Sequence, residues 1–328
     1  METLPPSQIN TVDGLARKLG LSVERLKAIA FDDEKRKFYR ELKIPKKNRR
    51  RRGQYRTVYK PAQRVAVLQK NIATWLSEHV HFQSYVQGFV QRRSTISNAT
   101  IHLGAKVLLH ADIKDFFDSI NVQQLKDSLM LVGCTDSIAD ILSRCCSLDG
   151  HLVQGSSASP LLANLVCRNL DTDLSTLGAA SACNYSRYAD DITFSGDVVP
   201  DTTAINRIIQ KHGFRLRDER CRTQRRGRSQ YVTGLSIADK VPRIPKRLKS
   251  RLRMELHFAS KYGLADHLDR IGSDEDPPHA LCRIGGWMSY VRSVEKQTFG
   301  KLVPDFERMR AEFGDEPDYE EDFDGSEH

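Results

Sequence analysis

Acidic residues stand directly beside short strand-forming runs, and this placement constrains the fold more than any other feature of the sequence. Residues 107–113 (Val-Leu-Leu-His-Ala-Asp-Ile) form an apolar run that ends beside an aspartate. Residues 184–188 and 192–195 are rich in β-forming side chains and are separated by Ala-Asp-Asp. Short apolar runs are typical of buried strands, and two β-prone runs with a short polar break are typical of a hairpin. We therefore predict an α+β fold in which a strand and a hairpin present carboxylates.

The candidate metal ligands are Asp112, Asp190 and Asp191. An Asp-Asp pair alone is weak evidence, since a chain of this composition holds about one by chance, and an ordinary acidic turn is the alternative. Asp112 favours a metal site over an ordinary acidic turn, because carboxylates from adjacent strands can converge on two Mg²⁺ ions. Mg²⁺ prefers oxygen ligands, and a metal pair about 3.5–4 Å apart stabilises both oxygens of a phosphoryl displacement. The acids fit a nucleic-acid polymerase, and a nuclease would use the same metals.

Basic residues are concentrated in three blocks. The chain has 51 Lys and Arg against 42 Asp and Glu, for a net charge of +9, and residues 311–328 hold nine of the acids and no Lys or Arg. The basic blocks are residues 43–56, 215–228 and 243–253. Lys and Arg release counterions when they neutralise phosphates, so the blocks favour a nucleic-acid partner; solvated basic faces are the alternative. We expect the acidic tail to be disordered, either competing with nucleic acid or aiding solubility.

Other features exclude several classes of protein. No apolar run is long enough to span a bilayer, and the N-terminal residues lack the pattern of a secretory signal. The seven cysteines include no C-x-x-C spacing, which argues against both a zinc site and a disulfide framework. We therefore expect a protein of the cytoplasm with no membrane partner and with reduced thiols.

Periodicity predicts the remaining elements. Residues 8–42 and 62–80 have helical spacing, with Ser22 as an N-cap in the first stretch. Residues around Gly53 are expected to form the basic tip of a hairpin. Residues 245–263 are expected to form a basic helix with one apolar stripe.

Three of these segments resemble motifs of the reverse transcriptases. Residues 188–191 (Tyr-Ala-Asp-Asp) are similar to the family's Tyr-x-Asp-Asp hairpin, and residues 112–117 (Asp-Ile-Lys-Asp-Phe-Phe) resemble its first catalytic strand motif. Residues 154–160 (Gln-Gly-Ser-Ser-Ala-Ser-Pro), followed by Asn164, are similar to the segment that contacts template and nucleotide. The three stand in the order that the family shows.

Two further segments resemble the bacterial retron type within this family. Residues 98–102 (Asn-Ala-Thr-Ile-His) look like its Asn-Ala-x-x-His segment, and residues 232–234 (Val-Thr-Gly) like its Val-Thr-Gly segment near the thumb. The resemblance covers roughly residues 44–294.

The resemblance implies a right-hand polymerase fold with fingers, a palm built on an antiparallel sheet, and a helical thumb. It implies four regions: a helical lead-in over residues 1–42, fingers and palm over 43–237, a thumb over 238–310, and the acidic tail over 311–328.

The resemblance also implies roles for residues in catalysis. Asp112 and Asp190 would be the principal ligands of two Mg²⁺ ions, for which Mn²⁺ can substitute, with Asp191 in support and the main-chain carbonyl of Ile113 completing the metal sphere. The residues expected to contact the incoming deoxynucleoside triphosphate are Arg56, Phe117, Gln154 and Gly155. Phe117 matches the bulky residue that excludes a 2′-hydroxyl.

Contact with nucleic acid is expected from the basic blocks and the retron segments. The family's usual lysine is replaced by Arg220, which scarcely deprotonates, so we assign Arg220 to phosphate contact and not to proton donation. The full set of expected contacts is Lys46, Lys47, Arg49, Arg50, Arg51, Arg52, Asn98, His102, Arg220, Val232, Thr233, Gly234, Arg247, Lys249 and Arg251.

By this resemblance the protein is an RNA-directed DNA polymerase. The template would be a cognate noncoding RNA of the msr-msd type, the primer a guanosine 2′-hydroxyl in that RNA, and the product an RNA-linked single-stranded DNA (msDNA). Retron enzymes commonly act in anti-phage defence, here with a separate effector protein. The alternatives are a group II intron-like bacterial reverse transcriptase and a catalytically vestigial RNA-binding scaffold.

Overall fold

The computed structural model describes residues 5–45, 55–227 and 229–311. The chain forms two compact units, and the division falls between Gln230 and Tyr231. The sequence-based expectation placed the end of the fingers and palm at residue 237. The Val-Thr-Gly segment lies in the C-terminal unit, and the boundary of the fingers and palm at residue 237 stays a prediction.

A four-stranded antiparallel sheet lies at the centre of the N-terminal unit, with the strand order β6-β7-β3-β8. The strands are β3 (Val107–Asp112), β6 (Asn184–Tyr188), β7 (Asp191–Gly196) and β8 (Arg222–Arg225). The predicted buried strand and the predicted hairpin are therefore both confirmed, and they are neighbours. The polar strand β8 was not predicted, because its sequence carries no apolar alternation.

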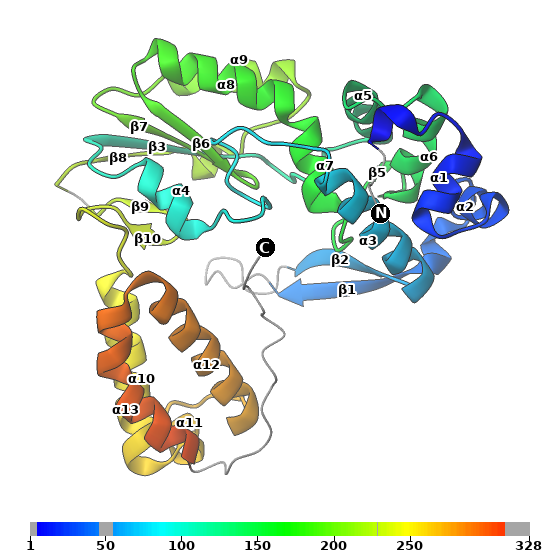
Figure 1. The fold of residues 1–328 in the computed structure, drawn as a ribbon. Helices are drawn as coiled ribbons and strands as arrows, with labels where there is room; N and C mark the ends of the chain where they lie inside the picture. Colours follow the sequence, from blue (N-terminus) through cyan, green and yellow to red (C-terminus); the bar gives the residue numbers. More distant parts are fainter. Residues whose placement is uncertain (1–4, 46–54, 228, 312–328) are drawn as a thin grey trace. The chain divides into compact units, whose positions relative to one another are not determined.

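Alternation of side chains gives this sheet two different faces. Helices α8 (Arg168–Ala180) and α9 (Thr202–Lys211) cover one face (Figure 1), which carries buried apolar side chains such as Leu109, Ala111, Ile192 and Phe194. The other face carries Asp112 and Asp191 at one end. Helix α4 (Thr95–Ile101) lies against another part of that face. The residue that caps the helix, His102, is hydrogen-bonded to side chains of β6 and β7 there.

A separate two-stranded hairpin precedes the sheet in the sequence. It consists of β1 (Tyr39–Pro45) and β2 (Tyr55–Pro61), paired antiparallel with Ile44 opposite Arg56. The predicted hairpin is confirmed, and its basic tip, with Lys46, Lys47 and Arg49 to Arg52, lies outside the described residues. Because β1 begins at Tyr39, the expectation of helices up to residue 42 is wrong for its last part.

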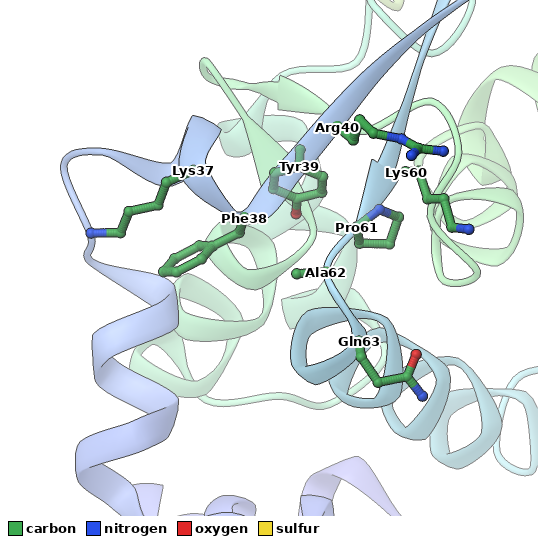
Figure 2. Close-up of a pocket in the computed structure, with 8 residues that line it drawn as sticks. All are labelled: Lys37, Phe38, Tyr39, Arg40, Lys60, Pro61, Ala62 and Gln63. Carbon is green, nitrogen blue, oxygen red and sulfur yellow. The ribbon is translucent and has the colours of Figure 1, made fainter.

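A pocket of about 380 Å³ lies where this hairpin leaves the body of the unit (Figure 2). Its lining comes from the start of β1 and the end of β2: Lys37, Phe38, Tyr39, Arg40, Lys60, Pro61, Ala62 and Gln63. Arg40 and Lys60 are register partners and are both exposed. The pocket is therefore basic, and none of the three aspartates lines it.

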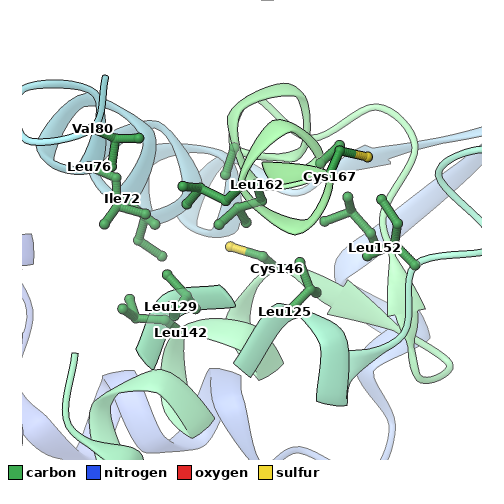
Figure 3. Packing of buried hydrophobic residues seen from close by; sticks show 14 of the residues in the cluster. Ile72, Leu76, Val80, Leu125, Leu129, Leu142, Cys146, Leu152, Leu162 and Cys167 are labelled. Carbon is green, nitrogen blue, oxygen red and sulfur yellow. The ribbon is translucent and has the colours of Figure 1, made fainter. Parts of the chain in front are cut away.

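The main core of this unit lies between helices. Figure 3 shows side chains such as Leu76, Leu129, Leu142 and Leu162 turned toward one another. Besides α8 and α9, the helices that contribute to this core include α1 (Val12–Leu19), α2 (Val23–Ala30), α3 (Gln63–Ser77), α5 (Val122–Leu131), α6 (Asp136–Cys145) and α7 (Ser159–Val166). Ser22 caps α2 by accepting a hydrogen bond from the Arg25 amide, as predicted. The N-terminal helices α1 and α2 therefore share the core of the unit that follows them.

The C-terminal unit begins with a short hairpin and continues as helices. Its elements are β9 (Tyr231–Val232), β10 (Leu235–Ser236), α10 (Lys246–Tyr262), α11 (Leu264–Arg270), α12 (Pro277–Val294) and α13 (Lys296–Ala311). The predicted basic helix is α10, whose buried stripe includes Leu252, Leu256 and Ala259. Among the described residues, no helix is both long and apolar enough to cross a bilayer.

Candidate active site

Asp112 and Asp191 lie directly opposite each other on neighbouring strands. Asp112 ends β3, and its register partner on β7 is Asp191. Register partners of an antiparallel pair project to the same face, so both side chains leave the sheet on one side. Asp190 precedes β7 in the hairpin turn, and its carbonyl accepts a hydrogen bond from the Ile113 amide at 3.0 Å. The structure therefore brings the three aspartates together at one end of the sheet.

Burial and neighbouring carboxylates raise the pKa of two of these aspartates. Burial raises the pKa of Asp191, and Asp190 and Asp112 raise it further, to about 6. The pKa of Asp190 is also raised, first by burial and then by the charge of Asp112. Like charges held close together out of water favour the protonated form. The same concentration of negative charge favours a bound cation.

Two arginines partly neutralise Asp112. Arg220 donates a hydrogen bond from Nη1 to Oδ2 of Asp112 at 2.5 Å, and Arg217 Nη1 lies 2.9 Å from Oδ1. The second contact is an ion pair without hydrogen-bond geometry, so Oδ1 of Asp112 is a buried oxygen with no hydrogen bond. Arg220 is about half exposed, whereas the Asp112 side chain is almost fully buried. Arg220, which is expected to contact phosphate, thus contacts the carboxylate of Asp112 directly.

The donor set suits a hard divalent cation. Carboxylate oxygens are the ligands that Mg²⁺ prefers, and Oδ1 of Asp112, which has an ion pair with Arg217 but no hydrogen bond, is a candidate ligand atom. No group of three or more His, Cys, Asp or Glu side chains in the described part of the chain is already arranged to hold a metal ion. Asp112 instead faces the two arginines. Metal binding here would therefore displace Arg220 from Oδ2.

Two of the predicted nucleotide contacts lie against the hairpin. The Gln154 carbonyl accepts a hydrogen bond from the Tyr59 amide at 2.8 Å. Gly155 has φ +117°, and a Cβ there would meet the Tyr59 carbonyl at 2.6 Å, so only glycine fits this approach. Strand β2 also carries the exposed Arg56. The structure thus joins the Gln-Gly segment to the strand of Arg56.

Phe117 follows Asp112 by five residues and is half-buried between other aromatic rings. Its ring centroid is 5.3 Å from that of Phe116 and 6.1 Å from that of Phe89. Phe116 is buried, whereas Phe89 is exposed. One side of the Phe117 ring is therefore held by the core.

The structure corrects the assignment of Asn98 and His102 to RNA contact. Their side chains are only 1% and 0% exposed. His102 is hydrogen-bonded to Ser195 through Nδ1 and to Ser186 through Nε2, both at 2.7 Å, and Ser186 donates to Asn98. Side chains this deeply buried do not reach a bound RNA. They instead tie α4 to both strands of the catalytic hairpin.

The Val-Thr-Gly segment forms the turn between β9 and β10. Val232 is fully buried, so its side chain also does not fit RNA contact. Thr233 and Gly234 have φ +45° and +83°, the left-handed pair that a two-residue type I′ hairpin requires. Gly234 is exposed and Thr233 is half-buried, so RNA contact by these two residues remains a proposal.

The three basic residues predicted on α10 have different environments. Arg247 and Arg251 are exposed. Lys249 instead pairs with the buried Glu295 at 3.0 Å, and Glu295 also accepts a hydrogen bond from the Ile244 amide. We therefore correct Lys249 from an RNA contact to a structural ion pair, because its ammonium group is already neutralised inside the unit.

Sequence reasoning missed two arginines at the site. Arg217 lies at Asp112, and its only signal was membership of the basic block 215–228. Arg187, next to the Tyr-Ala-Asp-Asp segment, is fully buried against Asp171. No local pattern predicts the pairing of a strand residue with a helix residue that precedes it by 16 positions.

Comparison with known proteins agrees with this geometry. Residues 44–234 match the family described as reverse transcriptase (RNA-dependent DNA polymerase). The chain is 25% identical over 315 residues to the Retron Ec86 reverse transcriptase of Escherichia coli, which covers 94% of this chain and 92% of that protein. It is 30% identical over 320 residues to the Retron Mx65 reverse transcriptase of Myxococcus xanthus, covering 89% of this chain and 70% of that protein.

Among solved structures, telomerase from Candida albicans in complex with a fragment of telomeric RNA aligns over 81% of this chain and 56% of its own. The sequence identity is 12% and the TM-score is 0.42. A likeness at this score supports no conclusion about the chain.

An antiparallel sheet that presents three aspartates, within a sequence that matches the family over more than half its length, defines a nucleic-acid polymerase: the chain belongs to the reverse transcriptase family. Its relatives place it in the retron type, as an RNA-directed DNA polymerase. The predicted right-hand α+β fold is confirmed, and the four-stranded sheet is its palm. Members of this family generally use divalent metal ions.

Proposed function

We propose that Asp112 and Asp190, supported by Asp191, form the centre at which this protein adds deoxynucleotides to a primer on an RNA template. The observation that carries this proposal is the register of the palm, which pairs Asp112 with Asp191 beside the turn of Asp190. The raised pKa of Asp190 and Asp191 supports it, because clustered carboxylates without cations are electrostatically unfavourable.

The reaction joins a primer hydroxyl to the α-phosphorus of a deoxynucleoside triphosphate. The hydroxyl loses its proton, the new P–O bond forms, and the bond to the β-phosphate breaks so that pyrophosphate leaves. Two Mg²⁺ ions, or Mn²⁺ in their place, would stabilise the charge on the attacking and leaving oxygens. Asp112, Asp190 and the Ile113 carbonyl would hold them, with Asp191 in support. Arg220, released from Asp112, would lie free to contact phosphate.

Other residues would select and orient the nucleotide. Arg56 on β2 would pair with the triphosphate, and Gln154 and Gly155, which lie against β2, would contact the nucleotide and its base pair. Phe117 would lie under the sugar and exclude a 2′-hydroxyl. Its contact with the buried Phe116 supports this role, because a side chain that packs on the core cannot easily move aside.

The retron relatives support a more specific activity. We infer a cognate noncoding RNA as template, a guanosine 2′-hydroxyl in it as primer, and an RNA-linked single-stranded DNA as product, made in the cytoplasm as part of anti-phage defence with a separate effector. The β1–β2 hairpin would belong to the fingers and helices α10 to α13 to the thumb. Arg247, Arg251, Thr233, Gly234 and the basic residues 46–52 would contact the RNA.

Primer extension on an RNA template with purified protein tests the assignment of the acids. Asp190→Ala should abolish DNA synthesis while RNA affinity stays within about twofold, because the substitution removes a metal ligand and no cation. Asp197→Ala is the matched control. Asp197 directly follows β7, the strand that Asp190 precedes, but it pairs with Lys106 at the surface, so its loss should leave synthesis unchanged. Retained synthesis in Asp190→Ala would contradict the assignment.

A further inference from the structure

The turn that carries Asp190 is backed by a fully buried ion pair. Arg187 on β6 donates from Nε to Oδ1 and from Nη2 to Oδ2 of Asp171 on α8, both at 2.6 Å. The two side chains are 0% and 1% exposed. The Tyr185 hydroxyl donates a third hydrogen bond to the same carboxylate at 2.6 Å. The Asp171 carboxylate therefore holds the guanidinium group in one orientation.

The third arm of this guanidinium reaches the catalytic turn. Nη1 of Arg187 donates to the Ala189 carbonyl at 3.0 Å. That carbonyl belongs to the planar peptide that also contains the amide nitrogen and Cα of Asp190. Ala189 has φ +58°, a left-handed conformation that is unfavourable for alanine and persists only where surrounding contacts determine it. The hydrogen bond from Arg187 is such a contact.

A second segment supports the turn from another side. The Arg187 carbonyl accepts a hydrogen bond from the Gln87 amide at 2.7 Å, and its amide donates to the Tyr85 carbonyl at 2.9 Å. The next residue, Gly88, lies so close to the turn that a Cβ there would be 2.4 Å from the Ala189 nitrogen. The turn is thus enclosed by backbone on one side and by the guanidinium on the other.

We propose that Arg187 is a positioning residue: held by Asp171, it fixes the 189–190 peptide and thereby sets the position of the Asp190 carboxylate relative to Asp112. Asp112 ends strand β3, whereas Asp190 lies in the turn between β6 and β7, so metal affinity depends on how exactly that turn presents Asp190. A buried ion pair adds little to the net free energy of unfolding, because desolvation of both charges offsets their attraction. Its three-way geometry fits the task of orienting a catalytic group. This role rests on the function proposed above.

The test measures Mn²⁺ binding by electron paramagnetic resonance, without nucleotide, in folded variants. In Asp171→Asn/Arg187→Met both charges are removed together, Tyr185 keeps an acceptor in the amide oxygen of the substituted side chain, and the Ala189 carbonyl loses its donor. We expect about 10- to 100-fold weaker Mn²⁺ binding and a lower kcat with little change in nucleotide KM, as for loss of groups that orient metal ligands. Arg187→Lys, which keeps a positive charge opposite Asp171, is measured alongside in case the double variant does not fold.

Tyr185→Phe is the matched control. It removes a hydrogen bond to the same carboxylate but leaves the bond from Arg187 to Ala189, so it should lower the melting temperature and leave Mn²⁺ affinity within about twofold. Equal weakening in this control, or wild-type Mn²⁺ affinity in a folded Arg187 variant, would overturn the positioning role. Asp190→Ala separates the two proposals: if it still binds Mn²⁺ like the wild type, the metal assignment itself fails.

Discussion

At the scale of single residues, Asp112 is subject to two opposing interactions. The nearby aspartates Asp190 and Asp191 repel its charge, and Arg217 and Arg220 attract it. In the absence of a cation the arginines balance part of the negative charge. A bound metal ion would take over that role, so protonation, arginine contact and metal binding compete for the same oxygens.

This competition predicts a dependence of metal binding on pH. The pKa of Asp191 is about 6, so Asp191 is ionised at pH 7.5 and gains a proton as the pH falls through about 6, and burial and the charge of Asp112 raise the pKa of Asp190 as well. A protonated carboxyl is a poor ligand, and we therefore expect the Mg²⁺ concentration for half-maximal synthesis to rise about tenfold between pH 7.5 and pH 5.5. Titrations of Mg²⁺ at several pH values measure it. A requirement that does not change with pH would contradict the clustered arrangement.

Phe117 gives a second prediction at this scale. Phe117→Ala opens space beside the sugar, so discrimination against ribonucleotides should fall by about tenfold or more, with deoxynucleotides still incorporated. The ratio of kcat/KM for the two nucleotide types measures this. Phe116→Leu is the control, because Phe116 is buried in the core and should affect stability first. Unchanged sugar selectivity in Phe117→Ala would remove Phe117 from that position.

Sequence patterns could predict the aspartates but not their partners. Asp112 ends a β-prone run and Asp191 precedes another, so the sequence indicates that their carboxylates can converge, whereas their common face follows from the register that pairs them. The attachment of Arg187 to Asp171, or of Arg217 to Asp112, depends on the packing of segments far apart in sequence. An arginine beside a catalytic motif has the same local appearance whether it is buried or solvated.

At the scale of elements, α4 is joined to the catalytic hairpin by a directional chain of hydrogen bonds. Burial lowers the pKa of His102 to about 3, so the ring is neutral and has one donor and one acceptor nitrogen. Ser186 donates to Asn98, so it accepts from Nε2 of His102, and Nδ1 accepts from Ser195. In this arrangement both ring nitrogens of His102 have a hydrogen-bond partner, and Ser186 Oγ both accepts and donates.

We predict that this network makes the stability of the protein depend on pH. An unfolded histidine has a pKa near 6.5, whereas His102 in the fold stays neutral down to about pH 3. As the pH falls below 6.5 the unfolded state binds a proton that the folded state does not, so the free energy of unfolding should fall by about 2 kcal/mol at pH 5. His102→Asn should lose this component of the slope. Denaturant unfolding at pH 7.5 and pH 5 measures it.

Thr100→Ala is the control for that experiment, because Thr100 lies on the exposed side of α4 and makes only a hydrogen bond within the helix. It should keep the full pH slope. At pH 7.5 both variants should bind RNA like the wild type. A loss of RNA affinity in folded His102→Asn, with an unchanged pH slope, would restore His102 as an RNA contact.

Helix α10 shows the same distinction between inward and outward side chains. Arg247 and Arg251 are on its exposed surface, while Lys249 is neutralised by Glu295. The sequence shows three basic residues at alternate positions, and helical periodicity alone does not tell which of them finds a buried acid 46 residues away.

We predict that the outward arginines contribute to the salt dependence of RNA binding. Replacing Arg247 and Arg251 by Gln should reduce the slope of log affinity against log salt by about 1.4 to 1.8, because each phosphate contact contributes about 0.7 to 0.9. Lys249→Gln should leave the slope unchanged and lower the melting temperature, since Glu295 would lose its partner. Filter binding between 50 and 200 mM salt distinguishes the variants. An equal effect of Lys249→Gln would contradict the assignment.

Elements that the local sequence pattern specifies were predicted correctly. Elements that form only through pairing with a distant strand were not. Strand β3 and helix α3 have strong periodicity and were found. Strand β1 begins at Tyr39, inside a stretch expected to be helical, because its charged residues become a strand only by pairing with β2.

At the scale of the whole molecule, the two units hold different parts of the proposed activity. The N-terminal unit contains the three aspartates, the residues proposed to contact the nucleotide, and the buried ion pair of Arg187 and Asp171. The C-terminal unit contains the Val-Thr-Gly turn and the basic face of α10. We propose that the site in the first unit copies a bound RNA into DNA that stays attached to it.

The most direct test is a denaturing gel of nucleic acid that copurifies with the protein expressed from its native locus, beside the Asp190→Ala variant. Samples are digested separately with RNase and DNase. We predict a discrete DNA band that shifts on RNase treatment and is absent from the variant. RNA alone in both samples would contradict self-primed synthesis at this site and would favour a scaffold that binds RNA without copying it.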